Sequence, residues 1–409
     1  MKLTQPSGIR SKICIIVSND MTSDSRVDRE AEALALNGHQ VVVLCPASSS
    51  TQPRHERRRH YTIIRHREPL LWRLVHTGPG KISGKASGQQ GRLRNAISLL
   101  LRATRLVSLV IVARLSLYAV AFRIRANVYH CNDLDTLDVG ALMALAGRRL
   151  VYDSHELYVE QITDGFLKVL YSAFERILVK FADVVISVNP LIAGELQRRY
   201  SIKKVHVVLN CPEVTPGQLE RTKTVGHAGH VTVLYHGGFY ADRGLENLIL
   251  ASGRFRKGVR LIMRGEGELR AKLERLAQGF SNVTFEKKVA MSAVVETAMD
   301  ADIGVLPYLP TNLNHIYCSP NKLFEYIQAG LALAVSNLPF LRQVVLGNGI
   351  GVVFDPNDPD DIARQINLAS TRGNLISFKR RVSDIRHRYS WDYEKEQLYS
   401  AYKDLEARP

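Results

Sequence analysis

The sequence predicts an α/β protein of two doubly wound, Rossmann-like domains that face each other across a cleft. Short runs rich in β-branched residues alternate with helix-like stretches from end to end, which is typical of parallel α/β architecture. The chain has 409 residues, roughly twice the length of a typical domain. A polar stretch at 213–229 separates two sets of predicted strands, and we interpret it as a linker.

The first domain is predicted over residues 1–212 and the second over 230–390. Predicted strands of the first domain are 13–19, 41–46, 61–66, 127–132, 149–154, 183–188 and 205–210. Those of the second are 231–237, 259–264, 283–287, 302–307, 331–336 and 350–354.

The composition is that of a soluble globular protein. Hydrophobic residues make up 45% of the chain and charged residues 23%, a balance that excludes a wholly disordered or fibrous chain. The five cysteines are scattered and form no CxxC pair or Cys/His cluster. We therefore expect reduced thiols in a cytoplasmic protein, rather than a disulfide framework or a zinc site.

Positive charge is concentrated in a basic insertion of the first domain, at about 51–125. The chain has a net charge of +16, and this segment contributes +14, from 16 Lys or Arg residues and two glutamates. Such a block indicates an anionic partner, such as a membrane surface or a diphosphate-bearing substrate, while a solvated basic loop is an equally good interpretation. No nucleic-acid-binding motif accompanies the charge, so we expect no nucleic-acid partner.

Residues 98–121, within this insertion, are apolar but interrupted by arginines. Arg102, Arg105 and Arg114 leave no run near the ~18–20 apolar residues that a spanning helix needs. The segment predicts either a core helix with one solvent-exposed face or an amphipathic helix at a membrane surface.

The stretch SPNKLFEYIQAGLALAVSN at 319–337 predicts a helix followed by a buried strand. Ser319 is placed to cap the helix, and the next backbone N–H groups then point out of its positive end, which predicts a diphosphate site. These groups belong to Asn321, Lys322 and Leu323. Lys322 adds a cation, and Glu325, one turn on, could accept the hydroxyls of a ribose. An ordinary capped helix with Glu325 on its solvent side is the alternative.

A second element is predicted at the same edge of the sheet. Gly237 and Gly238 follow the strand at 231–236, and Arg243 opens the next helix. Paired glycines let a backbone approach a phosphate closely, and arginine supplies a bidentate charge. Both elements lie at carboxyl ends of strands, where α/β proteins bind ligands.

Sequence blocks along nearly the whole chain carry a family resemblance. They are SDSRVDREAEALALNGHQVVVLCP at 23–46, NDLDTL at 132–137, VYDSHE at 151–156, ADVVISVNP at 182–190, YHGGFYADRGLENL at 235–248, RGEGEL at 264–269, ADIGVLPY at 301–308 and SPNKLFEYIQAG at 319–330. In this order they resemble the retaining GT-B glycosyltransferases of glycosyltransferase family 4, the group 1 class. The resemblance implies a nucleotide-diphosphate sugar donor bound mainly by the second domain, an acceptor bound mainly by the first, and no obligatory metal. It also implies a C-terminal helix over 391–409 that crosses back to the first domain.

The resemblance implies roles for single residues. Glu325 matches the second glutamate of the family's Glu-x7-Glu motif, which binds the donor ribose. Tyr317 occupies the position of the first glutamate, so a contact between Tyr317 and the donor sugar is left open. Arg243 replaces the usual phosphate-binding lysine. Gly238 stands where the family has a second phosphate-binding arginine, so Lys322 or another basic group would have to supply that charge.

A histidine and a glycine-rich turn complete the implied site. His155 matches the family's histidine beside the reacting sugar, and Gly265, Glu266 and Gly267 match the turn that lines the cleft. His155 also follows the strand at 149–154, at a carboxyl end, as a histidine with a catalytic role would. The alternative is a structural histidine whose hydrogen bonds are all made within the core.

We therefore predict a hexosyltransferase-like enzyme that moves a sugar from a nucleotide-diphosphate sugar to an acceptor hydroxyl with retention of configuration. The basic insertion suits a glycan or lipid-linked acceptor in cell-envelope polysaccharide synthesis, and a cytoplasmic enzyme peripheral on the inner face of the membrane. Two alternatives stay open. They are a non-hydrolysing nucleotide-sugar epimerase and a catalytically degenerate basic binding or scaffold protein.

Overall fold

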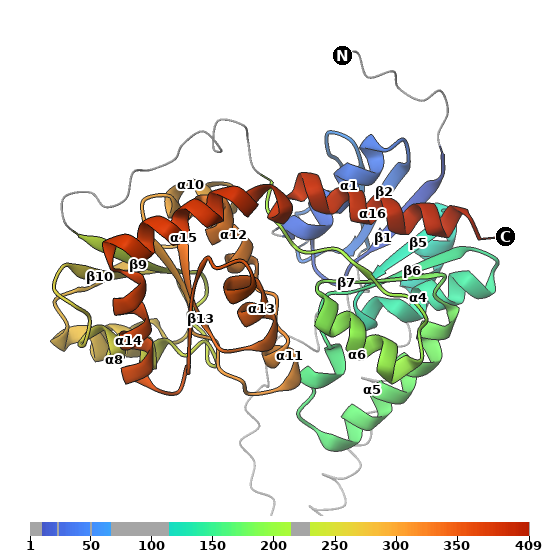
Figure 1. The fold of residues 1–409 in the computed structure, drawn as a ribbon. Helices are drawn as coiled ribbons and strands as arrows, with labels where there is room; N and C mark the ends of the chain where they lie inside the picture. The colour runs from blue at the N-terminus through green and yellow to red at the C-terminus, as the bar shows by residue number, and fades with distance from the viewer. Residues whose placement is uncertain (1–9, 23, 50, 67–113, 214–229, 409) are drawn as a thin grey trace, which may run out of the picture. The chain divides into compact units, whose positions relative to one another are not determined.

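The computed structural model describes residues 10–22, 24–49, 51–66, 114–213 and 230–408, which form two mainly parallel β-sheets with helices packed beside them (Figure 1). The chain divides into two compact units, Met1–Asp153 with Glu175–Asp183 and Ser154–Phe174 with Val184–Pro409. Residues 214–229 of the predicted linker lie outside the described residues, and the predicted domain bounds stay predictions.

The first sheet has eight strands in the order β3–β4–β2–β1–β5–β6–β7–β8. The strands are β1 (Lys12–Ile16), β2 (Gln40–Pro46), β3 (His55–Arg57), β4 (Thr62–His66), β5 (Val128–Asn132), β6 (Arg149–Ser154), β7 (Val184–Ser187) and β8 (His206–Val207). The helices between them are α1 (Ser25–Leu36), α4 (Leu134–Leu145), α5 (Gly165–Leu178) and α6 (Pro190–Tyr200). Strand β1 pairs in parallel with both β2 and β5, so the order of strands reverses beside it, as in doubly wound folds.

The second sheet has six strands in the order β11–β10–β9–β12–β13–β14. The strands are β9 (Val231–His236), β10 (Val259–Arg264), β11 (Val283–Glu286), β12 (Ile303–Leu306), β13 (Ala332–Ser336) and β14 (Gly351–Phe354). The helices are α8 (Leu245–Ser252), α9 (Arg270–Leu276), α10 (Val294–Ala298), α11 (Leu313–Ile316), α12 (Asn321–Ala329), α13 (Pro339–Gly347), α14 (Pro359–Ala369), α15 (Arg372–Ile385) and α16 (Trp391–Glu406). All five neighbouring strand pairs are parallel.

The predicted α/β fold is confirmed, and each predicted strand overlaps an observed one. The sequence pattern does not predict β3, because its residues His-Glu-Arg are all polar and its outer two side chains are exposed. Strand β3 runs antiparallel to β4 at the edge of the sheet. A short polar edge strand carries no apolar alternation that could reveal it.

The basic insertion is described only in part, since residues 67–113 lie outside the described residues. Of the predicted helix at 98–121, residues 114–121 belong to a described helical stretch, 114–124. Side chains hold this stretch to α4 and to the end of β4. The Tyr118 hydroxyl donates to Asp138 of α4 at 2.6 Å, and Ser116 and His66 of β4 are hydrogen-bonded at 2.8 Å.

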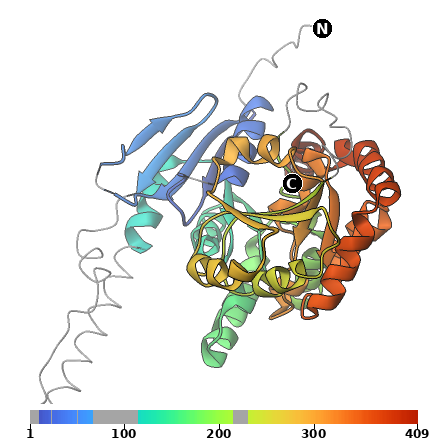
Figure 2. The ribbon, with the colours of Figure 1, turned by 90° about the vertical axis from the view of Figure 1, so that its left-hand side faces the viewer.

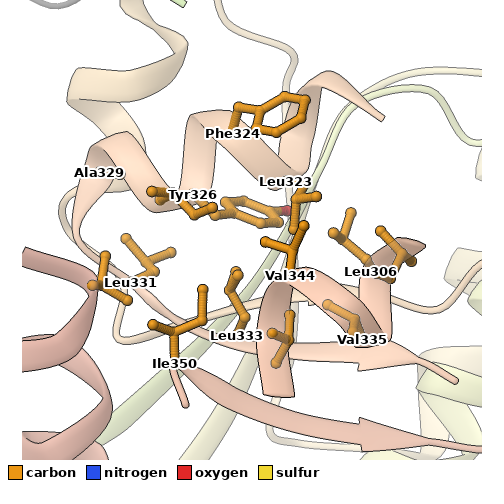
Figure 3. Packing of buried hydrophobic residues seen from close by; sticks show 14 of the residues in the cluster. Leu306, Leu323, Phe324, Tyr326, Ala329, Leu331, Leu333, Val335, Val344 and Ile350 are labelled. Carbon is orange, nitrogen blue, oxygen red and sulfur yellow. The ribbon is translucent and has the colours of Figure 1, made fainter. Parts of the chain in front are cut away.

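Helix α12 is fixed by the core of the second sheet. Figure 3 shows Leu323 and Tyr326 on the side of α12 that packs toward Leu333 and Val335 of β13, and all four side chains are fully buried. A Cβ atom at Gly304 would lie 2.4 Å from the Tyr326 ring, so glycine on β12 leaves room for the tyrosine. The position of the helix is therefore set by close packing beneath it.

Candidate functional site

A cavity of about 530 Å³ lies at the carboxyl ends of β9 and β10. Seven residues predicted from the sequence line it, and they are Gly237, Gly238, Glu266, Gly267, Asn321, Lys322 and Glu325. Further lining residues, not predicted from the sequence, include His236, Tyr240, Arg264, Lys288 and Met291. The structure thus brings the two predicted binding elements, the glycine pair and the start of α12, to one cavity.

The loops that follow β9 and β10 line the cavity and touch each other through their backbones. The N–H of Gly237 donates to the Arg264 carbonyl at 2.9 Å, and the N–H of Phe239 donates to the Glu266 carbonyl at 2.9 Å. A Cβ atom at Gly267, where φ is +157°, would lie 2.4 Å from the Phe239 carbonyl oxygen. Gly265, likewise, faces the Gly237 carbonyl and does not line the cavity. Gly265 thus lets the two loops touch, and its predicted contact with the donor stays a prediction.

The positive end of α12 differs from the prediction in two details. Pro320, not Ser319, occupies the cap position, and no side chain caps the helix. The N–H of Leu323 donates to the Pro320 carbonyl at 2.9 Å, and the Leu323 side chain is buried in the core. At this helix end, the N–H groups of Asn321 and Lys322 are the ones left for a ligand.

Lys322 extends over Gly237 and is surrounded by aromatic rings. A Cβ atom at Gly237 would lie 2.3 Å from Lys322 Cε, so glycine leaves the space that the lysine fills. The Lys322 ammonium lies 5.7 Å from the centre of the Tyr235 ring and 6.0 Å from that of Tyr308. Burial by itself lowers the pKa of Lys322, but neighbouring tyrosine and glutamate groups raise it above its ordinary value. The ammonium is therefore charged at neutral pH.

Arg243 lies beside this lysine but does not line the cavity. Its guanidinium carbon is 4.4 Å from the centre of the Tyr308 ring, a cation–π contact on the ring that Lys322 also approaches. The predicted phosphate-binding role of Arg243 requires its side chain to leave that ring or the phosphate to reach it.

Tyr240 takes up space next to Gly238. A Cβ atom at Gly238 would lie 2.2 Å from the Tyr240 ring, and Tyr240 is 52% exposed. An aromatic ring therefore covers the position from which the family's second arginine would extend. The arginine is missing, and the cations that line the cavity are Lys322, Arg264 and Lys288. Arg264 is already held by Glu286 at 2.7 Å.

His236 holds the Glu325 carboxylate and was not predicted from the sequence. Its Nε2 lies 2.8 Å from Glu325 Oε2, and its ring packs on Tyr326 with centres 4.6 Å apart. Burial, the largest effect, lowers the pKa of His236 despite the carboxylate beside it. The neutral imidazole therefore donates from Nε2, because the carboxylate can only accept.

His155 and Tyr317, like Arg243, Gly265 and Leu323, do not line this cavity. His155 follows β6 and is half-buried, and Tyr317 follows α11. Neither lines the cavity, so their proposed contacts with a sugar stay predictions.

One buried cluster in the described part of the chain has metal-ligating groups. Ligand atoms of Glu30, His130 and Asp153 all lie within 4.8 Å of one another. The Arg26 guanidinium, however, forms ion pairs of 2.9 Å with both Glu30 and Asp153. A metal ion would have to displace this arginine, so the cluster is better described as a buried ion network that ties α1 to the end of β6.

Two family models match successive parts of the chain. The model of Glycosyltransferase Family 4 matches residues 25–213, and the model of Glycosyl transferases group 1 matches residues 230–371. The chain belongs to the group 1 glycosyltransferases. It is a transferase, and the predicted family is confirmed. No curated protein sequence matches this glycosyltransferase.

Solved structures show that the fold of this glycosyltransferase is GT-B. Sucrose-phosphate synthase from Thermosynechococcus elongatus matches with a TM-score of 0.68 and 19% identity, over 97% of this chain and 100% of that one. Anabaena HepE in complex with UDP-glucose matches with a TM-score of 0.65 and 14% identity, over 96% and 99%. The E. coli structure titled trehalose-6-phosphate, bound with UDP-2-fluoro glucose, matches with a TM-score of 0.65 and 12% identity, over 98% and 100%.

We expect Gly267→Ala to lower the free energy of unfolding by about 3 kcal/mol, because the added methyl group would meet the Phe239 backbone. Urea denaturation measures this change. Gly279→Ala is the matched control, since a Cβ atom there has no neighbour within 4 Å. Equal stability of the two variants would show that the loops after β9 and β10 do not need to touch.

Proposed function

We propose that this glycosyltransferase binds a nucleotide-diphosphate sugar in the cavity beside α12 and transfers the sugar to an acceptor hydroxyl with retention of configuration. The observation that carries the proposal is the pairing of Lys322 and Glu325 one turn apart at the open end of α12. Both side chains line one cavity. A cation with free N–H groups suits a diphosphate, and a fixed carboxylate suits a ribose.

The chemistry proposed for this site rests on positioning and charge. In same-face transfer, the bond between the sugar carbon and the leaving phosphate oxygen breaks while a bond to the acceptor oxygen forms. The acceptor proton passes to the departing diphosphate. Lys322, the start of α12 and Arg243 would stabilise the negative charge that develops, and His155 would act at the sugar. We propose that no metal is required, because these cations would neutralise the diphosphate.

The ligands described for similar structures support a nucleotide-diphosphate sugar as the donor. HepE is described with UDP and glucose, and the E. coli structure with UDP-2-fluoro glucose. WaaG, a glycosyltransferase described as involved in lipopolysaccharide biosynthesis, matches with a TM-score of 0.61 and 15% identity. We propose that the present enzyme likewise serves cell-envelope polysaccharide or lipid-linked glycan synthesis.

The proposed acceptor depends on where in the cell the enzyme acts. None of the helices in the described ranges combines the length and apolar composition needed to cross a membrane. We propose a cytoplasmic enzyme that docks on the inner face of the membrane through residues 51–125, where basic groups favour anionic lipid. A binding protein without turnover is the second candidate, favoured by Tyr317 and by the missing arginine at Gly238.

We expect the full chain to bind a nucleoside diphosphate in the presence of EDTA. Glu325→Ala and Arg243→Ala should each weaken binding about 10- to 100-fold, because each removes a charged hydrogen-bonding group. Calorimetry with UDP, ADP and GDP measures the affinities, and Glu268→Ala, an exposed glutamate outside the cavity, is the control. Binding that needs Mg²⁺ or Mn²⁺, or that both variants retain, would contradict the site.

His236→Phe should weaken nucleoside diphosphate binding about tenfold, because Glu325 loses the donor that orients it. Affinity for inorganic pyrophosphate, which has no ribose, should stay unchanged. His236→Gln should recover part of the loss, since its amide can donate to the carboxylate. An equal loss for both ligands would instead indicate general damage to the cavity.

His155→Ala should lower turnover about 100-fold or more while leaving donor affinity nearly unchanged, if the imidazole acts in the transition state. Steady-state rates with a donor that the enzyme hydrolyses, together with calorimetry, separate these effects. A large loss of folded protein, seen by circular dichroism, would support a structural histidine.

A further inference from the structure

Helix α5 presents its apolar side chains to the outside. Its exposed large apolar residues have exposed fractions between 37% and 77%, and they are Phe166, Leu167, Val169, Leu170, Tyr171, Phe174 and Ile177. Glu175 and Leu178 are the buried residues of this fully described helix. Figure 2 shows α5 as a long helix in green. Contiguous exposed apolar surface of this kind marks an interaction site.

Polar contacts hold the opposite side of α5 to the protein. The Tyr152 hydroxyl donates to Glu175 at 2.7 Å, and the Lys168 ammonium contacts Glu160 at 2.7 Å. Glu160 also pairs with Arg199 at 2.6 Å. A helix of a soluble protein turns its apolar side inward and its polar side outward. Helix α5 does the reverse, so its sequence is suited to an apolar partner outside the domain.

The width of the apolar surface decides the shape of that partner. At 100° per residue, the exposed apolar side chains of α5 cover an arc of roughly 160°, from Val169 round to Leu167. Tyr171 lies beyond Leu167, and its ring stacks on that of Tyr158. A partner helix covers a narrower stripe and would leave one edge in water. A flat apolar layer, into which the helix sinks along its length, covers the whole arc.

The charges around the arc suit an anionic layer. Arg176 borders the arc, Lys180 follows the helix, and both are exposed. Of the nearby acids, Glu175 is buried on Tyr152 and Glu160 is engaged by two cations, whereas Glu156 and Asp164, which precede the helix, are exposed. The net charge of the whole chain, +16, adds a general attraction to an anionic surface.

We propose that α5 docks on the surface of an anionic lipid bilayer and lies in its plane with the apolar arc in the interface. Fourteen residues make a helix of about 21 Å, too short to span the bilayer. The inference does not depend on the transfer reaction. It adds a second contact to the one proposed for residues 51–125, and it rests on a different observation.

Vesicle co-sedimentation of the full chain tests the proposal. We expect binding to vesicles of phosphatidylcholine with phosphatidylglycerol, and weaker binding to phosphatidylcholine alone. The double variant Phe166→Ser, Val169→Ser should lose about 100-fold in affinity, because two large apolar groups leave the interface. Leu142→Ser with Leu145→Ser on α4, which are 42% and 70% exposed, is the matched control and should bind as the wild type does.

Two further experiments distinguish the contribution of α5 to vesicle binding from that of the basic residues, and test whether α5 enters the lipid. Replacing Arg57, Arg58 and Arg59 by Ser should weaken binding most at low salt, whereas the α5 variant should be weakened at every salt concentration. Phe166→Trp should show a blue-shifted emission and quenching by brominated lipid when anionic vesicles are added.

Three results would overturn the proposal. One is a wild-type chain that does not bind anionic vesicles at low salt. Another is an α5 variant that binds them as tightly as the wild type, which would place docking elsewhere. The third is light scattering without lipid that shows a wild-type dimer and a monomeric α5 variant, which would make α5 a contact between two copies of the chain.

Discussion

The contact between the loops that follow β9 and β10 determines where the second sheet can hold a ligand. Gly237 and Phe239 share hydrogen bonds with Arg264 and Glu266, and the backbones are too close for a side chain between them. Gly237, Gly238 and Gly267 line the cavity with backbone alone, which can approach a ligand more closely than side chains can. Because the contact also fixes the ends of both strands, it places His236 and Arg264 at the cavity wall.

Helix α12 contributes side chains both to the core and to the cavity. Tyr326 is buried against Gly304, and its hydroxyl accepts the backbone N–H of His236 at 3.0 Å. The same histidine holds Glu325, the residue that precedes Tyr326. A carboxylate that faces the cavity is thus positioned through a tyrosine in the core and a histidine at a strand end. Such an arrangement favours binding by a site that is already formed.

The fold was predictable because most of its strands are buried on both faces and appear as continuous apolar runs, as in VVVL of β2 and LIM of β10. Strand β3 was not predictable, since nothing apolar marks it. Within the site, the glycine pair and α12 were found from spacing and helix-end chemistry. The cap was assigned wrongly because Ser319 and Pro320 both suit a helix start, and their φ and ψ angles, not their side chains, decide which residue caps.

His236 shows what a single sequence cannot reveal. A lone histidine at the end of a strand has no partner in its own segment, and Glu325 lies 89 residues away. The stacking of Arg243 and the placing of Tyr240 over Gly238 are also tertiary effects, which no local pattern encodes. Residues predicted from the sequence thus line one cavity, but the sequence did not predict the contacts that orient its charged groups.

The aromatic surroundings of Lys322 have a consequence for the amount of enzyme in a cell. Lys322 and Arg243 approach the same Tyr308 ring, and in the described part of the chain neither forms an ion pair with a carboxylate. An anionic ligand that binds both cations stabilises the folded protein by mass action. Unfolded chains are removed by proteases, so a modest change in stability alters abundance several-fold. The steady-state level of this enzyme would then rise and fall with the supply of its anionic ligand.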